Sequence, residues 1–440
     1  MLMIISLSSS LLRSKWQKNN KMQKLFTEFT STTAAQWKEQ LVKDLKGIDY
    51  NTLVWKTNSG IDVQPFYTKE NLNTNPTPVF TKNDWAICEN VFVTDAKVAN
   101  GQALNALQNG ASGLVFHITQ KTDFAVLLKG ILLQHIYSLF MVKPEFEKDL
   151  TDFLSSIPTG DACFVECDIT LEGKVELHNS SAICINTNLY QEAGSNTMNE
   201  LAFSMAHLNE YLNIASSSVK TIHLNVSVGG DFFMEIAKLR ALRKLTNFLL
   251  SQYNIKATVH IHAQTTLINK SVVDSYNNML RSTTEAMSAS IGGANSIVVL
   301  PFDVEFNSQN DFSSRMARNQ QLILKDESYL NIVADMAAGS YYIETLTETL
   351  CEKAWEQFKV IESKGGLLAS LKSNYIQDII SKDAETLIQQ FKEGKLVLVG
   401  VNKFQNKNEE VKSVTRKNAV HSSGIKTINL SESLEQQLAN

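Results

Sequence analysis

The chain has 440 residues, of which 43% are hydrophobic and 20% charged, so it can bury a sizeable core and is typical of soluble globular proteins. Its formal net charge of -4 and isoelectric point near 6.1 do not favour nucleic acid or an anionic membrane as a partner. The five cysteines are scattered and form no C-x-x-C pair. They predict buried free thiols in a reducing compartment, and hence a cytoplasmic protein without a metal centre.

The first residues, MLMIISLSSSLL, are apolar, but the basic residues follow them and no A-x-A-like cleavage site is visible. The run is also too short to span a bilayer. Met22 opens the first patterned segment. We therefore expect residues 1–21 to be a disordered extension, or an artefact of a start assigned at Met1 instead of Met22.

An amphipathic helix is predicted over residues 33–47, where Thr33 can cap the start and Gly47 the end. Its apolar stripe is made of Trp37, Leu41 and Leu45. Residues 48–80 carry Pro, Asn and Thr with little periodicity, which favours an extended arm lying over a surface. We assign residues 22–97 to this helix and arm, and expect the stripe and Trp55 to be buried on a partner or on this chain.

From about residue 98 the chain alternates short, β-rich apolar segments with helix-length segments. The predicted strands are GLVFHI (113–118), IYSLFMV (136–142), ACFVECDI (162–169), SAICINT (181–187), TIHLNVSV (221–228), ATVHIHA (257–263) and NSIVVLPFD (295–303). Predicted helices include 195–216, 231–252 and 271–290. Strands buried on both faces between helices indicate a parallel sheet, and these strands with one weaker candidate favour a (β/α)₈ TIM barrel over residues 98–345.

The alternative to a barrel is an open doubly wound sheet, but no G-x-G-x-x-G follows the first strand. After the barrel strands, helices are predicted at 311–328, 347–363 and about 383–395, ahead of LVLVGVNKF (396–404). We assign residues 346–404 to a C-terminal helical extension. The polar residues 405–440 are expected to form a loose tail.

Several blocks, in order along the chain, resemble the methylmalonyl-CoA mutase family. They are the segment from Trp37 to Thr68 with VKDLKGIDYNTLVWKTNSGIDVQPFYT, DFFMEIAKLRALRKL (231–245), HAQTT (262–266), DSYNNMLRSTTEAMSASIGGANSI (274–297), SSRMARNQQLILKDES (313–328), AAGSYYIETLTETL (337–350) and GVNKF (400–404). The resemblance implies a barrel whose axis holds the pantetheine chain of CoA. It also implies the radical interconversion of (R)-methylmalonyl-CoA and succinyl-CoA with adenosylcobalamin.

Four positions depart from the catalytic pattern that the resemblance implies. Asn188 and Leu189 stand where catalytic chains have a Tyr-His pair before EAG. Glu89 aligns with a catalytic Tyr, and Thr221 with an Arg that would pair with the substrate. A carboxylate or thioester in a dry pocket needs such donors. We therefore expect no catalytic residues in this chain.

The resemblance further implies a cobalamin module, a flavodoxin-like domain whose D-x-H-x-x-G histidine ligates cobalt. Too few residues follow Gly400 for such a domain, and HSSG at 421–424 has no Asp two residues before His421. We expect no cobalamin-binding domain and no cofactor bound by this chain, with adenosylcobalamin held by a partner. The chain thus resembles the small (beta) subunits of heterodimeric mutases, which pair with a large catalytic subunit. A chain with its own acyl-CoA isomerase or acyl-CoA-binding activity is the alternative.

A remnant of the pocket is expected among polar residues that match catalytic chains. These residues are His262, Gln264, Asn295 and Ser296. They are interpreted either as a residual CoA or acyl pocket, or as a hydrogen-bonded barrel interior without chemistry. His260 and His262 also form H-x-H, a pattern that can hold a divalent metal in barrel hydrolases, but no further His or Asp ligand set stands out.

Overall fold

The computed structural model describes residues 28–73, 75–166, 181–215, 219–307, 310–406 and 423–438. The chain divides into a small N-terminal unit ending at Trp55 and a large unit beginning at Lys56. The expectations for residues 1–21 and for His421 lie outside the described residues.

The N-terminal unit contains the predicted amphipathic helix, α2 (Ala34–Asp44). Thr33 caps it through a capping box, because its side chain accepts from the Gln36 backbone N–H while the Gln36 side chain accepts from the Thr33 N–H. The short helix η1 (Tyr50–Leu53) follows. Within its described surroundings α2 has no fully buried residue, so its apolar stripe remains partly exposed.

The large unit is built around eight strands of one sheet. They are β3 (Ala86–Phe92), β4 (Gly113–Ile118), β5 (Tyr137–Val142), β6 (Cys163–Glu166), β7 (Ala182–Asn186), β8 (Thr221–Val228), β9 (Thr258–Thr265) and β10 (Ser296–Val298). Their order is β6-β5-β4-β3-β10-β9-β8-β7, and every recorded pair is parallel. Strands β6 and β7, at the two ends of this order, contact each other, so the sheet closes into the expected (β/α)₈ TIM barrel.

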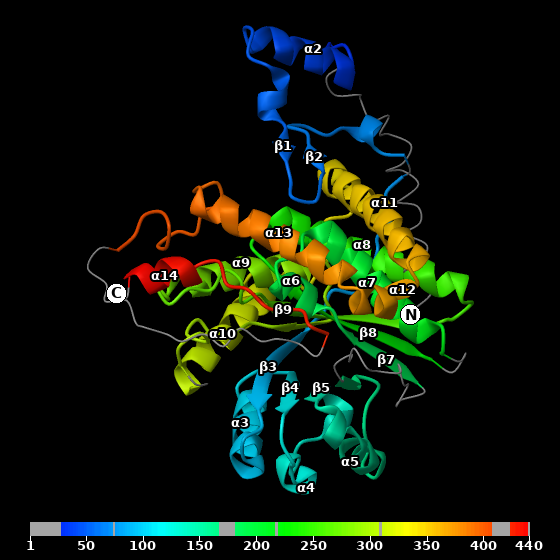
Figure 1. Ribbon diagram of the computed structural model, residues 1–440, viewed down its shortest axis with the longest axis vertical. Coiled ribbons are helices and arrows are strands. Elements are labelled where there is room, and N and C mark those ends of the chain that lie inside the picture. The colour runs from blue at the N-terminus through cyan, green and yellow to red at the C-terminus, as the bar shows by residue number, and fades with distance from the viewer. Residues whose placement is uncertain are drawn as a thin grey trace, which may run out of the picture. The chain divides into compact units, whose positions relative to one another are not determined.

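Helices surround this barrel (Figure 1). They are α3 (Ala96–Gln108), α4 (Phe124–Leu127), α5 (Pro144–Ser155), α6 (Asn188–Glu192), α7 (Thr197–Leu212), α8 (Phe232–Gln252), α9 (Asn277–Ile291) and α10 (Asp311–Leu322). Shorter elements are β1 (Trp55–Lys56), β2 (Asp62–Val63), η2 (Lys69–Asn71), η3 (Leu133–His135) and the π-helical turn η4 (Ile323–Glu327). The extension consists of α11 (Tyr341–Ser363), α12 (Gly366–Lys372), α13 (Tyr375–Lys392) and α14 (Glu432–Leu438).

Successive side chains along each strand point alternately to two faces of the sheet, and both faces are buried. On β8, Ile222, Leu224 and Val226 belong to the main hydrophobic core together with residues of α7, α8 and α11. His223 and Asn225 alternate with them and face the barrel interior, where both are fully buried. This double burial explains why the strands read as near-continuous apolar runs. No helix among the described residues has both the length and the apolar character needed to cross a membrane.

The first barrel strand, β3, begins at Ala86 and so lies ahead of the boundary expected at residue 98. The reason is that Glu89 interrupts its apolar run, and Arg318 of α10 balances this charge only in the folded chain. The expected boundary between residues 345 and 346 also falls inside a helix, because α11 starts at Tyr341.

The expectation of a loose tail is wrong for residues 423–438. Ile425 and Leu430 are buried, and α14 follows them. The backbone N–H of Ile428 donates to the Glu192 carbonyl at 2.8 Å, and that of Leu430 to the Ile268 carbonyl at 3.0 Å. The polar composition concealed a segment whose few apolar groups pack against the barrel.

Three segments of the chain pack closely together at Gly194. Its φ is +93°, and an added Cβ would lie 2.7 Å from Ile428 Cδ1 and 2.8 Å from Ala384 Cβ of α13. Gly194→Ala is therefore expected to lower the free energy of unfolding by about 3 kcal/mol or more, through backbone strain and overpacking together.

Urea denaturation measures this loss. Gly394→Ala is the matched control, because its φ is +69° and nothing lies within 4 Å of the added Cβ, so only about 1 kcal/mol of strain is expected. Equal losses in the two variants would contradict the close packing at Gly194.

Candidate functional site

Aromatic and imidazole rings fill the centre of the barrel. The Tyr137 ring stacks on His260 and His262, with ring centroids 5.2 and 5.4 Å apart. Phe164 lies 4.4 Å from His223, and the Tyr137 hydroxyl lies 2.9 Å from His223 Nε2. These residues come from β5, β6, β8 and β9, so side chains from opposite walls meet on the axis.

The imidazoles of this stack are neutral at physiological pH. Burial lowers the pKa of His260 and of His262 to about 3, and burial also holds the pKa of His223 well below its usual value. Ser296 Oγ lies 2.8 Å from His262 Nδ1 and 3.1 Å from His260 Nε2. One hydroxyl thus serves both rings, as expected of polar groups that must be satisfied inside a core.

The four pocket residues expected from the sequence separate in the structure. His262 and Ser296 meet inside the barrel, whereas Asn295 Oδ1 accepts from Arg243 Nη2 and from the Ile261 N–H at 2.8 and 3.0 Å. Asn295 therefore ties α8 to the sheet. Gln264 is half-buried on β9, next to Val298 in the sheet register.

Metal binding by the H-x-H pair finds no support in the described part of the chain. No group of three or more His, Cys, Asp or Glu side chains there is arranged to hold a metal ion. His260 and His262 instead share Ser296.

Amide side chains close the barrel above the rings. Asn188 Nδ2 donates to Asn225 Oδ1 at 2.7 Å, and Asn225 Nδ2 donates to Glu166 Oε1 at 3.3 Å. The Asn188 backbone N–H donates to Asn186 Oδ1 at 3.1 Å. Asn188 therefore belongs to a polar layer at the C-terminal mouth, the end at which TIM barrels carry their active sites.

The other substituted positions do not converge on this layer. Leu189 packs into the main hydrophobic core. Glu89 pairs with Arg318 of α10 and so faces the helices, while its neighbours Cys88 and Asn90 take the interior face of β3. Thr221 starts β8, level with Ala182 and Thr258, at the opposite end of the strand from the mouth.

Glu192 is a mouth residue whose role the sequence did not reveal. Its carboxylate accepts from Ser227 Oγ at 2.7 Å and from the Leu267 N–H at 3.1 Å. Burial raises its pKa, against these hydrogen bonds. Glu192 therefore cross-links the ends of β7, β8 and β9. The only sequence signal was an acidic residue beside Gly194 in a strand-end loop.

A cavity of about 350 Å³ remains on the other side of the mouth. It lies between the ends of β3 and β10 and helix α10, and Phe92, Leu300, Pro301 and Ala317 are among its apolar lining residues. Arg318, already paired with Glu89, lines it too. The cavity does not include His262, Ser296 or Gln264, so the expected pocket residues do not border it.

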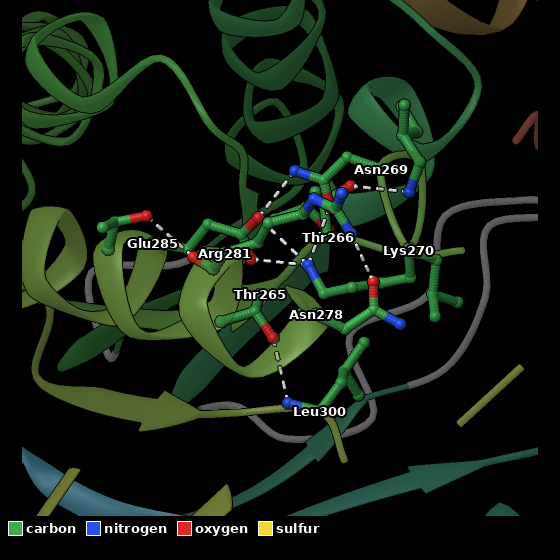
Figure 2. A network of polar contacts seen from close by, with 12 residues as sticks. Thr265, Thr266, Asn269, Lys270, Asn278, Arg281, Glu285 and Leu300 are labelled. Carbon is green, nitrogen blue, oxygen red and sulfur yellow. Dashed lines mark hydrogen bonds and ion pairs between the residues drawn. The ribbon is translucent and has the colours of Figure 1, made fainter. Parts of the chain in front are cut away.

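A second buried polar network joins the loop after β9 to helix α9 (Figure 2). Lys270 Nζ contacts the Glu285 carboxylate at 2.8 Å, and Asn269 Nδ2 donates to the same carboxylate at 2.7 Å. Arg281 Nη1 donates to Asn278 Oδ1 at 2.7 Å. Lys270 and Glu285 are both fully enclosed, so this ion pair serves the fold and not a solvent-accessible site.

The histidines of the described residues do not fit the lower ligand of cobalamin. His207, His223 and His262 are buried, His260 lies against Ser296, His117 lies against Asn90 and His135 sits in η3. None of them stands in a D-x-H-x-x-G sequence.

The fold and the barrel interior together define a TIM-barrel protein. Aromatic and imidazole rings fill its axis, and its C-terminal mouth is closed on one side. Residues 157–437 match the methylmalonyl-CoA mutase family. A protein named methylmalonyl-CoA mutase small subunit from Porphyromonas gingivalis is 32% identical, with 88% of this chain and 72% of the relative covered. The chain therefore belongs to the methylmalonyl-CoA mutase family.

Two further relatives carry the family's name. A methylmalonyl-CoA mutase from Cereibacter sphaeroides is 28% identical over 85% of this chain and 64% of its own length. A probable methylmalonyl-CoA mutase small subunit from Mycobacterium bovis is 32% identical over 52% of this chain and 39% of its own length. The chain thus spans less than two thirds of either relative.

The neutral imidazoles predict that the free energy of unfolding decreases in acid. His262 keeps a pKa of about 3 when folded but takes up a proton below about pH 6.5 when unfolded, so stability falls as the pH drops through this window. Between pH 7 and pH 5 this single residue accounts for about 2 kcal/mol of the loss. In His262→Gln the pH dependence of the free energy of unfolding should become shallower by that amount.

Urea titrations at pH 5, 6 and 7 measure this effect. His135→Gln is the control, because His135 is exposed in η3 and lies outside the stack. A His262→Gln curve parallel to that of the unsubstituted protein would contradict the neutral, buried state of this ring.

Proposed function

We propose that this chain is the small, non-catalytic subunit of a heterodimeric, adenosylcobalamin-dependent methylmalonyl-CoA mutase. The complex interconverts (R)-methylmalonyl-CoA and succinyl-CoA, and this chain stabilises the large catalytic subunit, which holds the cofactor. The four described cysteines are free thiols, which supports the cytoplasm as the location.

The observation that carries the proposal is the packing of the barrel axis. Tyr137, Phe164 and the three imidazoles leave the centre occupied by protein, where the family resemblance implies a pantetheine chain. Displacing such a core would cost several kcal/mol, since large core side chains contribute about 3–5 kcal/mol each. The same packing weighs against the alternative that this chain binds or isomerises an acyl-CoA by itself.

Activity measurements test the proposal. The isolated chain is expected to show no turnover of methylmalonyl-CoA with adenosylcobalamin and no retention of the cofactor in equilibrium dialysis. The large subunit with this chain should be active, and more resistant to thermal inactivation than the large subunit alone. Turnover by the isolated chain would refute the non-catalytic role, and a large subunit indifferent to this chain would refute the stabilising role.

The N-terminal unit is the proposed contact with the large subunit. Helix α2 has no fully buried residue, and Val42, Ile48 and Trp55 are exposed, so this unit presents apolar surface that a partner could cover. A permanent heterodimer is expected to bury on the order of 2,000 Å² or more, and aromatic residues dominate such interfaces.

Removing this unit should abolish the complex without unfolding the barrel. A chain lacking residues 1–55 keeps Ile61 and Val63, which are buried in the main core. It is expected to remain folded by circular dichroism but to fail to co-purify with the co-expressed large subunit. A truncated chain that binds with undiminished affinity would contradict the proposed contact.

A finer version replaces two residues of the stripe. Trp37→Ala with Leu41→Ala should raise the Kd of the complex by about thirtyfold or more, if these groups are buried together at the interface. Glu39→Ala, on the exposed face of the same helix, is the matched control and should leave the Kd unchanged. Isothermal titration or biolayer measurements on the purified subunits provide the readout.

A further inference from the structure

The last described segment of the chain, residues 423–438, crosses the mouth of the barrel, and we name it the C-terminal strap. It reaches two strand-end loops through its backbone, with Ile428 bonded to Glu192 after β7 and Leu430 bonded to Ile268 after β9. In Figure 1 the strap (red) ends in α14 beside α9. Strand-end loops at this face are where TIM barrels bind their ligands, so the strap lies where a ligand or another domain would approach.

Side chains of the strap form hydrogen bonds with backbone carbonyls of the loop after β9. Asn429 Nδ2 donates to the Leu267 carbonyl at 3.0 Å and to the Lys270 carbonyl at 2.8 Å. Ser431 Oγ lies 3.4 Å from the Lys270 carbonyl. These carbonyls would otherwise be open to a ligand or to water, and the strap satisfies them from within the chain.

Glu435 of α14 makes the shortest of these hydrogen bonds. Its carboxylate accepts from Ser271 Oγ at 2.6 Å and from the Val272 N–H at 3.1 Å, and all three residues are buried. Ser271 is joined in turn to Asn278, which donates to the Ser271 carbonyl at 2.7 Å. A charge-assisted pair of hydrogen bonds therefore fastens the strap to the network of Figure 2.

The strap also keeps that network away from water. Burial lowers the pKa of Lys270 and raises that of Glu285, although the two side chains are paired at 2.8 Å. The carbonyl of Lys270 is bonded directly to Asn429 of the strap. If the strap dissociated from the mouth, it would expose the loop that carries this ion pair. The barrel strands would keep their backbone hydrogen bonds to one another.

We propose that the C-terminal strap is an intrachain lid. It covers the loops that follow β7 and β9, and it opens as a unit while the barrel stays folded. The lid is held by hydrogen bonds to loops and by the apolar side chains of Ile425, Ile428 and Leu430. Its helix α14 makes few contacts with other helices or strands, which is a feature of segments that open locally. The proposal depends only on contacts within this chain, and it holds whether or not the chain serves a mutase.

Native-state hydrogen exchange of the full chain tests the lid directly. Amides of residues 425–438 and 267–272 should exchange together, and at least about a hundredfold faster than those of β8, because local opening precedes global unfolding. Glu435→Ala should accelerate both segments by about tenfold or more and leave β8 unchanged. Gln437→Ala is the matched control, since Gln437 is exposed on the same helix, and it should change nothing.

The opposite result overturns the lid. Strap amides that exchange only at the rate of β8 would show that the segment is an inseparable part of the core. The unsubstituted protein gives this answer alone, so a poorly folded Glu435→Ala variant does not obscure it.

A separable lid should also bind in trans. A chain ending at residue 422 is expected to lose protection at residues 188–194 and 267–272, and a synthetic peptide of residues 423–440 should restore it. A peptide with Glu435→Ala should need at least about a tenfold higher concentration. Failure of the unsubstituted peptide to restore protection in a folded truncated chain would contradict the lid.

Discussion

The stacking of neutral rings on the barrel axis is the interaction on which the rest of this protein depends. A closed sheet of eight strands needs interior side chains that fill it to core density. Here Tyr137 and Phe164 interleave with imidazoles from β8 and β9. Imidazoles can serve as core groups only while they are uncharged and hydrogen-bonded, and Ser296 meets the second condition for two of them.

The blocks that resemble the mutase family hold the helices to the barrel. Arg240 forms buried ion pairs with Asp335 and Glu344, which join α8 to the loop before α11 and to α11 itself. Arg243 donates to the carbonyls of Val259 and Gly293, each at 2.7 Å. Breaking one partner of a buried pair typically costs about 3–5 kcal/mol. In this chain the family's sequence blocks therefore preserve the scaffold.

The two sides of the mouth differ in a way that follows from chain connectivity. On the side of β7 and β9, the C-terminal strap and the Glu192 carboxylate occupy the strand-end loops. On the side of β3 and β10, the cavity beside α10 remains. Gly194 allows the closed side to form, because only a residue without Cβ lets Ile428 and Ala384 approach so closely.

The sequence by itself determined the barrel, because strands buried on both faces must be apolar throughout and must alternate with helices. It also determined α2, whose cap and stripe are local. Only the tertiary structure decided the first strand and the strap: Glu89 is tolerated in β3 because Arg318 arrives from 229 residues away, and Glu435 is buried because Ser271 and Val272 meet it from 164 and 163 residues away. For a similar reason the sequence left two interpretations of the polar remnant open, a residual pocket and a hydrogen-bonded interior. Alternation placed His262 on the inner face correctly, but which rings meet it there depends on strands that come together only when the barrel closes.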